Sequence, residues 1–184
     1  MENLYAQTTV TGTITDAADG ATLPGVNIIE KGTSNGVTSD FDGNYSIDVA
    51  EGATLNIPAG TKILANNGGT DVYLAVLKGA TININGTATN PVVMSSLNGE
   101  AGDWGGLILL GKAPINSVTG GTATSTSEIA SLPYGGSTPD DNSGILRYVR
   151  VEYSGGKADG SSENNGFSFY GVGNGTTIAY IQMF

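Results

Sequence analysis

Asp40, Asp42 and Asn44 stand at alternate positions before Tyr45, a spacing of oxygen-bearing side chains that could bind a cation. This is the pattern of the first half of an EF-hand loop, and Ca²⁺ prefers clustered oxygen ligands. The bidentate glutamate that completes such a loop is missing, because the twelfth position falls on Glu51, beyond a strand-like stretch. An ordinary Asp-Gly hairpin turn explains the same residues. We therefore expect no cofactor, with Ca²⁺ at these three residues as the alternative.

Asp103 and Trp104 form a second candidate site in a glycine-rich stretch. An exposed Trp104 would stack on a sugar ring while Asp103 binds hydroxyl groups. The alternative, which we favour, is that Trp104 fills a corner or the core, because a large aromatic ring supplies much buried area. Tyr134 joins them as an aromatic candidate, and a polysaccharide or cell-surface glycan is the partner that these residues would bind.

The densest charge cluster is formed by Asp140, Asp141, Arg147, Arg150 and Glu152. Parallel β-helix lyases and hydrolases act on polysaccharides with carboxylates and a basic residue on one exposed face. Arg150 and Glu152 are two apart in one expected strand and should face the same side, whereas Arg147 would face away in a regular strand. A cross-strand ion pair is the simpler interpretation. Because the sequence fixes no separation between two carboxylates, we predict no enzyme activity and keep Asp140, Asp141 and Arg150 as ligand-binding candidates.

Several tyrosines are placed so that they could form an aromatic ladder, and they are Tyr134, Tyr148, Tyr153, Tyr170 and Tyr180. Tyr148 and Tyr180 are 32 residues apart, and we expect them to stack coil on coil. Stacked like residues are ordinary packing in a solenoid, so the ladder is explained by structure before function.

Composition narrows the classes of function. The chain has no Cys and no His, which excludes disulfides, thiol nucleophiles, Ser-His or Cys-His catalysis, and typical zinc sites. The net charge of −10 disfavours nucleic acid and anionic membrane surfaces as partners. No apolar run reaches the roughly 20 residues of a transmembrane helix. With 29 glycines and only 13% charged residues, short strands and tight turns are favoured over helices.

The elements that must position these residues fall into two patterns. Alternating, β-rich segments are expected at 9–15, 26–29 and 45–49, with turns between them. From residue 52 the pattern changes, and Gly52–Ile57 returns 27 residues later as Gly79–Ile84. A repeat of this length is one coil of a β-solenoid, whose short strands stack on their counterparts in the next coil.

The rhythm of strands continues less regularly toward the C-terminus, with segments expected at 106–110, 145–153, 166–170 and 176–183. Residues 112–143 contain no clear strand and are expected to form a long loop on one side of the solenoid. Helix should be nearly absent. The aliphatic side chains expected to face inward are Leu55, Ile57, Ile82, Ile84, Val92 and Met94.

Four motifs mark the N-terminal part of the chain, namely Val10–Asp16, Leu23–Asn27, Lys31–Thr33 and Asp40–Ile47. Together they make residues 8–54 resemble the carboxypeptidase regulatory-like domain at the front of many TonB-dependent outer-membrane receptors of Gram-negative bacteria. The resemblance implies a small, non-catalytic β-sandwich. The domain looks incomplete here, because the chain passes into the repeat pattern at residue 52, and it would act as an N-terminal cap.

Further motifs follow in residues 52–184, and they are Gly52–Thr61, Gly102–Leu107, Gly111–Ile115, Tyr134–Gly136, Asp141–Gly144 and Gly171–Thr176. They resemble secreted or lipid-anchored bacterial proteins with a right-handed parallel β-helix. The resemblance implies a fold more than a function.

We therefore predict an all-β chain in three parts: a tag or signal-peptide remnant at 1–7, a truncated regulatory-like domain at 8–51, and a right-handed parallel β-helix at 52–184, truncated at its C-terminus. The predicted function is that of a non-catalytic extracellular or outer-membrane surface module of a Gram-negative bacterium, for adhesion, scaffolding or glycan capture. The alternatives are the N-terminal part of a TonB-dependent nutrient receptor, a polysaccharide lyase or hydrolase, and a structural subunit that self-associates through its C-terminal coil.

Overall fold

Strands form the framework of the chain. The computed structural model describes residues 8–16, 19–30, 35–49, 52–116, 124–158 and 162–184. Within these residues the one helical element is η1 (Gly69–Asp71), a single 3₁₀ turn. No helix in this part of the chain is long and apolar enough to cross a membrane. The chain is all-β, as its composition predicts.

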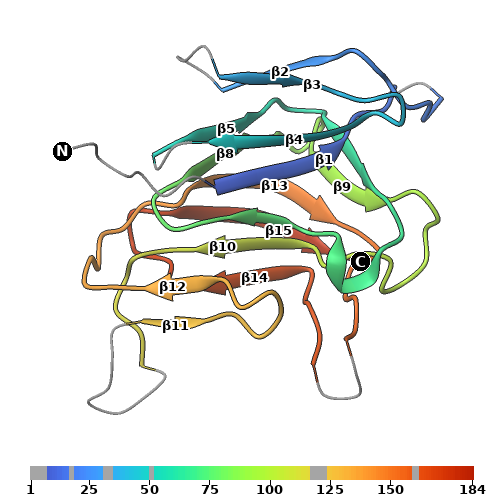
Figure 1. The fold of residues 1–184 in the computed structure, drawn as a ribbon. Helices are drawn as coiled ribbons and strands as arrows, with labels where there is room; N and C mark the ends of the chain where they lie inside the picture. Colours follow the sequence, from blue (N-terminus) through green and yellow to red (C-terminus); the bar gives the residue numbers. More distant parts are fainter. Residues whose placement is uncertain (1–7, 17–18, 31–34, 50–51, 117–123, 159–161) are drawn as a thin grey trace.

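The 27-residue repeat is a parallel stack of strands (Figure 1). β5 (Thr54–Ile57) pairs with β8 (Thr81–Asn85), so that Thr54 lies opposite Thr81 and Ile57 opposite Ile84. The stack continues through the first half of β13 (Gly144–Val151) and on to β15 (Thr177–Met183). The pairing register confirms the repeat residue for residue.

Two further parallel stacks complete the coils. In one, β9 (Val92–Ser96) lies between β6 (Lys62–Ala65) and the second half of β13. In the other, β10 (Leu107–Leu110) lies between β7 (Leu74–Val76) and β14 (Phe167–Tyr170). The three stacks enclose one core, because side chains from all of them belong to the same buried cluster.

The predicted inward positions are confirmed. Ile57, Ile82, Ile84, Val92 and Met94 are buried in the core, and Leu55 packs against it partly buried. Polar side chains of the same strands form rungs on the outside. Thr54 and Thr81 share a hydrogen bond of 2.7 Å between their hydroxyls, and Asn83 Nδ2 donates to Asn56 Oδ1 at 3.2 Å. This is the alternation that a half-buried strand requires.

β13 bends at Tyr148, where the backbone φ is 51°. The bend interrupts the alternation of the strand, so that Leu146 and Val149 are both buried although they are three residues apart. Arg147 is exposed just before the bend, and Arg150 contacts other surface side chains just after it. The expectation that Arg147 faces away from Arg150 is wrong, because it assumed a regular strand.

The bend is repeated in the next coil. Tyr180 has a φ of 57°, and its ring stacks on that of Tyr148 with centroids 4.4 Å apart and planes 8° from parallel. This confirms the predicted pair of the aromatic ladder. A positive φ is uncommon for a residue with a side chain, and ring stacking on the neighbouring coil offsets part of its cost.

The N-terminal segments form two antiparallel pairs that lie over the β5 end of the stacks (Figure 1). β1 (Thr8–Thr13) pairs with β4 (Asn44–Val49), and β2 (Asn27–Ile29) pairs with β3 (Gly36–Thr38). The sequence did not indicate β3. Asn35-Gly36 has the composition of a hairpin turn, but Gly36 pairs with Ile29 inside the strand, and the connection runs from Glu30 to Asn35.

Residues 112–143 contain a hairpin that the sequence did not predict. β11 (Thr124–Thr126) pairs with β12 (Pro133–Gly135), and the connection is closed by the hydroxyl of Ser127, which donates to Ile129 O and accepts from Leu132 N. The hairpin is tied to the third stack by a backbone hydrogen bond from Gly135 N to Gly111 O. We call residues 112–143 the excursion.

Candidate ligand-binding sites

An aromatic groove of about 380 Å³ lies where the excursion meets the end of β14. Tyr134 comes from β12, whereas Phe169 and Tyr170 come from β14. The rings of Tyr134 and Tyr170 are 4.9 Å apart between centroids and tilted by 34°. Phe169 is 38% exposed. The other lining residues are Pro114, Ile115, Asn116, Gly171 and Val172.

Backbone hydrogen bonds fix the two walls of the groove relative to each other. Ala113 N donates to Gly171 O at 2.9 Å, which holds the first residues of the excursion against the end of β14. Gly136 N donates to Ala113 O at 3.1 Å, and Lys78 Nζ donates to Gly135 O at 3.4 Å. Gly171 has a φ of 57° and lies so close that a Cβ there would be 3.0 Å from Gly135 N. The groove is therefore built by ordered backbone on both sides.

The chemistry of the groove is that of aromatic faces with a few neutral polar groups. Asn116 supplies an amide, and the two tyrosines supply hydroxyls. No lining residue is an acid or a base of the kind that transfers protons at neutral pH. The geometry can hold an amphipathic ring, but the lining side chains provide no pair of groups for general acid-base chemistry.

Asp103 and Trp104 lie elsewhere, and both are buried, at 4% and 3% exposed. The carboxylate of Asp103 accepts hydrogen bonds from Ser96 Oγ at 2.6 Å and from Glu100 N at 3.0 Å. Trp104 belongs to the core cluster, and its Nε1 donates to Glu152 O at 2.8 Å. A ring buried to this extent offers no face to a sugar at the surface. The structure thus places Trp104 as a core residue at a corner.

The charge cluster divides into two places. Asp140 is exposed and Asp141 half-buried at the corner before β13, where Asp141 Oδ2 accepts from Ser143 Oγ at 3.4 Å. Arg150 lies beyond the bend of that strand and pairs with Glu152 at 3.3 Å. The ion pair thus lies within one strand, whereas a cross-strand pair was expected. Across the strand, Arg150 Nε donates to Gln182 Oε1, and its guanidinium lies 5.1 Å from the ring centroid of Phe184.

Asp40, Asp42 and Asn44 form a tight turn between β3 and β4. Asp40 Oδ1 accepts from the backbone N–H groups of Asp42 and Asn44, both at 2.9 Å. Asn44 Oδ1 accepts from Thr13 Oγ1 at 2.6 Å. These oxygens thus satisfy protein donors in the turn. Among the described residues no group of three or more Asp, Glu, His or Cys side chains could hold a metal ion.

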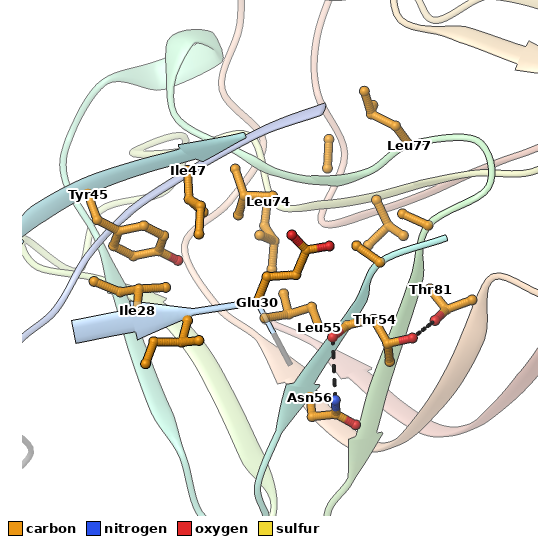
Figure 2. A pocket seen from close by; sticks show the side chains of 16 residues that line it. Ile28, Glu30, Tyr45, Ile47, Thr54, Leu55, Asn56, Leu74, Leu77 and Thr81 are labelled. Carbon is orange, nitrogen blue, oxygen red and sulfur yellow. Dashed lines mark hydrogen bonds between the residues drawn. The ribbon is translucent and has the colours of Figure 1, made fainter. Parts of the chain in front are cut away.

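A second cavity, of about 330 Å³, separates the N-terminal strands from the first coil (Figure 2). Apolar side chains line it from both sides, with Ile28 and Ile47 from the N-terminal strands and Leu55 and Leu74 from the coil. Burial raises the pKa of the Tyr45 phenol in its wall. A larger hollow of about 850 Å³ follows the same boundary. The N-terminal strands therefore cover the first coil without filling the space beneath them.

With this geometry, comparison with known proteins gives the class of the chain. It belongs to the pectate-lyase-like beta helix domain family, whose model matches residues 32–184. The match begins between β2 and β3, inside the segment that resembles a regulatory-like domain.

Two receptors of Formosa agariphila share a short stretch with this chain. TonB-dependent receptor P3 is 64% identical over 42 residues, which is 23% of this chain and 4% of the receptor. TonB-dependent receptor P39 is 54% identical over 52 residues, which is 28% of this chain and 5% of the receptor. The chain thus spans about a twentieth of the length of these relatives. No solved structure matches the chain.

Of the residues singled out as ligand-binding from the sequence, Tyr134 alone lines the aromatic groove. Tyr170 was noted as part of a ladder, and Phe169, Ile115 and Asn116 were not considered at all. Their meeting depends on where the excursion folds back, which no local pattern specifies. One usable signal was present: Phe169 and Tyr170 are adjacent, so a strand must present at least one of them away from the core.

Proposed function

We propose that the chain is a non-catalytic, cell-surface glycan-capture module and that the aromatic groove is its binding site. The observation that carries the proposal is the convergence of Tyr134, Phe169 and Tyr170 on one groove that also presents the amide of Asn116. Aromatic rings with polar edges suit ligands that have one apolar and one hydrogen-bonding side, and a sugar ring has both. The family membership and the receptor matches are consistent with a cell-surface module.

The chemistry of the lining residues favours capture over turnover. Polysaccharide hydrolysis needs a pair of suitably spaced carboxyl groups, and the groove is lined by none. The acids predicted to be available are engaged elsewhere, Asp103 with Ser96 and Glu152 with Arg150. The family description includes lyases, so the distinction from an enzyme has to be made on this chain's own residues. Within the proposal the β-helix is right-handed and serves as a rigid support for the groove.

A glycan-binding assay with matched variants tests this function. Immobilised polysaccharides are incubated with the protein and with Tyr134→Ala, and calorimetry is used for any polymer that binds. Loss of one stacking ring should weaken binding about two- to tenfold. The matched control is Phe41→Ala, because Phe41 is an aromatic residue that is 93% exposed in the Asp40–Asn44 turn. Equal binding by both variants, or release of sugar products by the parent protein, would refute the proposal.

A second candidate function is favoured by the receptor matches: the chain would be part of an outer-membrane nutrient receptor or work beside one. Both functions place the protein at the outer surface of a Gram-negative cell. Fractionation of producing cells, followed by protease treatment of intact cells, tests that location. Recovery of the protein in the cytoplasmic fraction, protected from protease, would contradict both candidates.

A further inference from the structure

We infer that the aromatic groove selects uncharged glycan chains and rejects polyuronates, the acidic class of polymer to which pectate belongs. The inference rests on the proposed function of the groove, and it adds the class of ligand. It goes against the expectation that the family description raises. The reason lies in where the basic residues of the chain are.

Binding of a polyuronate requires cationic groups placed to meet its carboxylates. The chain has seven basic residues, and none belongs to the segments that line the groove. There is no Lys or Arg from residue 113 to residue 146, nor from 158 to 184. Residues 117–123 lie outside the described structure, and by their sequence they add no charge.

The basic residues nearest the groove are committed or lie outside its lining. Lys78 Nζ donates to Gly135 O, on the backbone that carries Tyr134. Lys112 precedes the groove by two residues and is half-buried, but it does not line it. Two others form ion pairs, Arg150 with Glu152 and Lys157 with Glu163. The remaining three are Lys31, outside the described residues, Lys62 in β6 and Arg147 in β13.

The charge that does lie near the groove is negative. Asp141 Oδ2 is packed against Gly111, since a Cβ built there would be 2.6 Å from it, and Gly111 O accepts the hydrogen bond that anchors β12. Over the whole chain 17 acidic residues face 7 basic ones. Because charges are screened beyond about 8 Å at physiological salt, the nearby acid and the absence of cations in the lining decide the preference. An uncharged sugar meets only aromatic faces, one amide and hydroxyls.

A pair of polymers that differ only in charge tests the inference. Homogalacturonan is prepared fully methyl-esterified, and part of it is saponified to the polyuronate; a neutral galactan and a neutral xylan are added. Each is measured by affinity electrophoresis and calorimetry at low and high salt. Polyuronate is measured with Ca²⁺ and with a chelator, because a bridging cation could replace basic side chains. Parent protein, Tyr134→Ala, Tyr170→Ala, Lys112→Ala and the control Phe41→Ala are compared, each checked for native circular dichroism.

At least one neutral polymer should bind at least about tenfold more tightly than polyuronate, without dependence on salt, and Tyr134→Ala or Tyr170→Ala should weaken it while Lys112→Ala does not. Polyuronate binding that equals or exceeds neutral binding, whether it needs Ca²⁺ or Lys112, overturns the inference. If that binding is still lost in Tyr134→Ala, the proposed glycan-capture function survives. If no polymer binds, or binding is indifferent to both tyrosine variants, the proposed function itself fails.

Discussion

Replacement of Ile84 by Asp tests the assignment of inward and outward faces on which the fold depends. Ile84 is fully buried in β8, between Ile57 of the preceding coil and Leu146 of the following one. Loss of the aliphatic side chain costs about 2–5 kcal/mol. The buried carboxyl must be protonated, and raising its pKa from 3.9 to above 7 costs about 4 kcal/mol at neutral pH. An unpartnered carboxyl in the core adds about 1–3 kcal/mol.

The combined destabilisation of at least about 7 kcal/mol is comparable to the whole stability of a domain of this size. We therefore expect Ile84→Asp to be unfolded at pH 7, and to recover stability toward pH 4. The sign follows from the raised pKa of the folded state, whose contribution is present below the pKa of the unfolded carboxyl and is lost as the pH rises. The matched control is Asn85→Asp, the next residue of the same strand, which is exposed and should change stability by less than about 0.5 kcal/mol.

Urea unfolding followed by the fluorescence of Trp104, the only tryptophan, measures both variants. The buried indole should report the loss of the core directly. If Ile84→Asp and Asn85→Asp unfold at similar urea concentrations, the strand does not present these residues to opposite sides. The register of the stack would then be refuted along with the face assignment.

Three further substitutions test separate features. Tyr45→Phe should remove part of the loss of stability in alkaline solution: burial raises the pKa of Tyr45, so its contribution is present below the unfolded pKa of about 10 and is lost as the pH rises through the folded value, and urea midpoints at about pH 8 and 11 should diverge from those of the parent only at the higher pH. Gly144→Ala should destabilise by about 3 kcal/mol or more, because φ is 113° and the new Cβ would lie 1.9 Å from Ile82 O; a melting temperature equal to that of the parent would contradict this. Trp104→Phe should cost about 1–3 kcal/mol, because Glu152 O loses its donor and the smaller ring leaves a gap, and circular dichroism melting measures the loss.

The repeat could be predicted because two independent signals agreed in it. The residues Gly52–Ile57 and Gly79–Ile84 share both their order of residue types and their alternation of apolar and polar side chains. Stacking in register is the arrangement that lets both copies bury the same side, and the observed pairing has the same offset. Later coils differ in length at their corners, so their strands were found without their register.

The excursion could not be placed in the same way, although its effect was visible in one strand. Leu107–Leu110 are four consecutive apolar residues, and all four are buried. Leu107 and Leu109 belong to the core cluster, whereas Ile108 and Leu110 do not. An uninterrupted apolar strand indicates that both of its faces are covered. The run thus predicted a cover over the third stack, but not that the cover would be β11 and β12 or that Tyr134 would meet Tyr170.

The bend at Tyr148 was beyond sequence reasoning for a different reason. Positive φ is expected of Gly, Asn or Asp, and a tyrosine gives no such indication. Tyr148 adopts it because the second half of β13 must turn to pair with β9 after the first half has paired with β8. The pairing of the neighbouring coil, which is a tertiary constraint, decided the backbone conformation and with it the direction of Arg147.

The acids that attracted attention from sequence alone share a structural task. At the corners of a chain built from short strands, backbone N–H groups leave the ladder and need acceptors. Asp40 accepts from two such groups, Asp103 accepts from Glu100 N, and Asn142 accepts from Gly144 N. Carboxylates and amides at alternate or clustered positions are therefore what corners require, whatever the protein binds. In this fold aromatic residues on a non-repeating segment, as in the aromatic groove, are the better guide to a ligand, because no corner requires them.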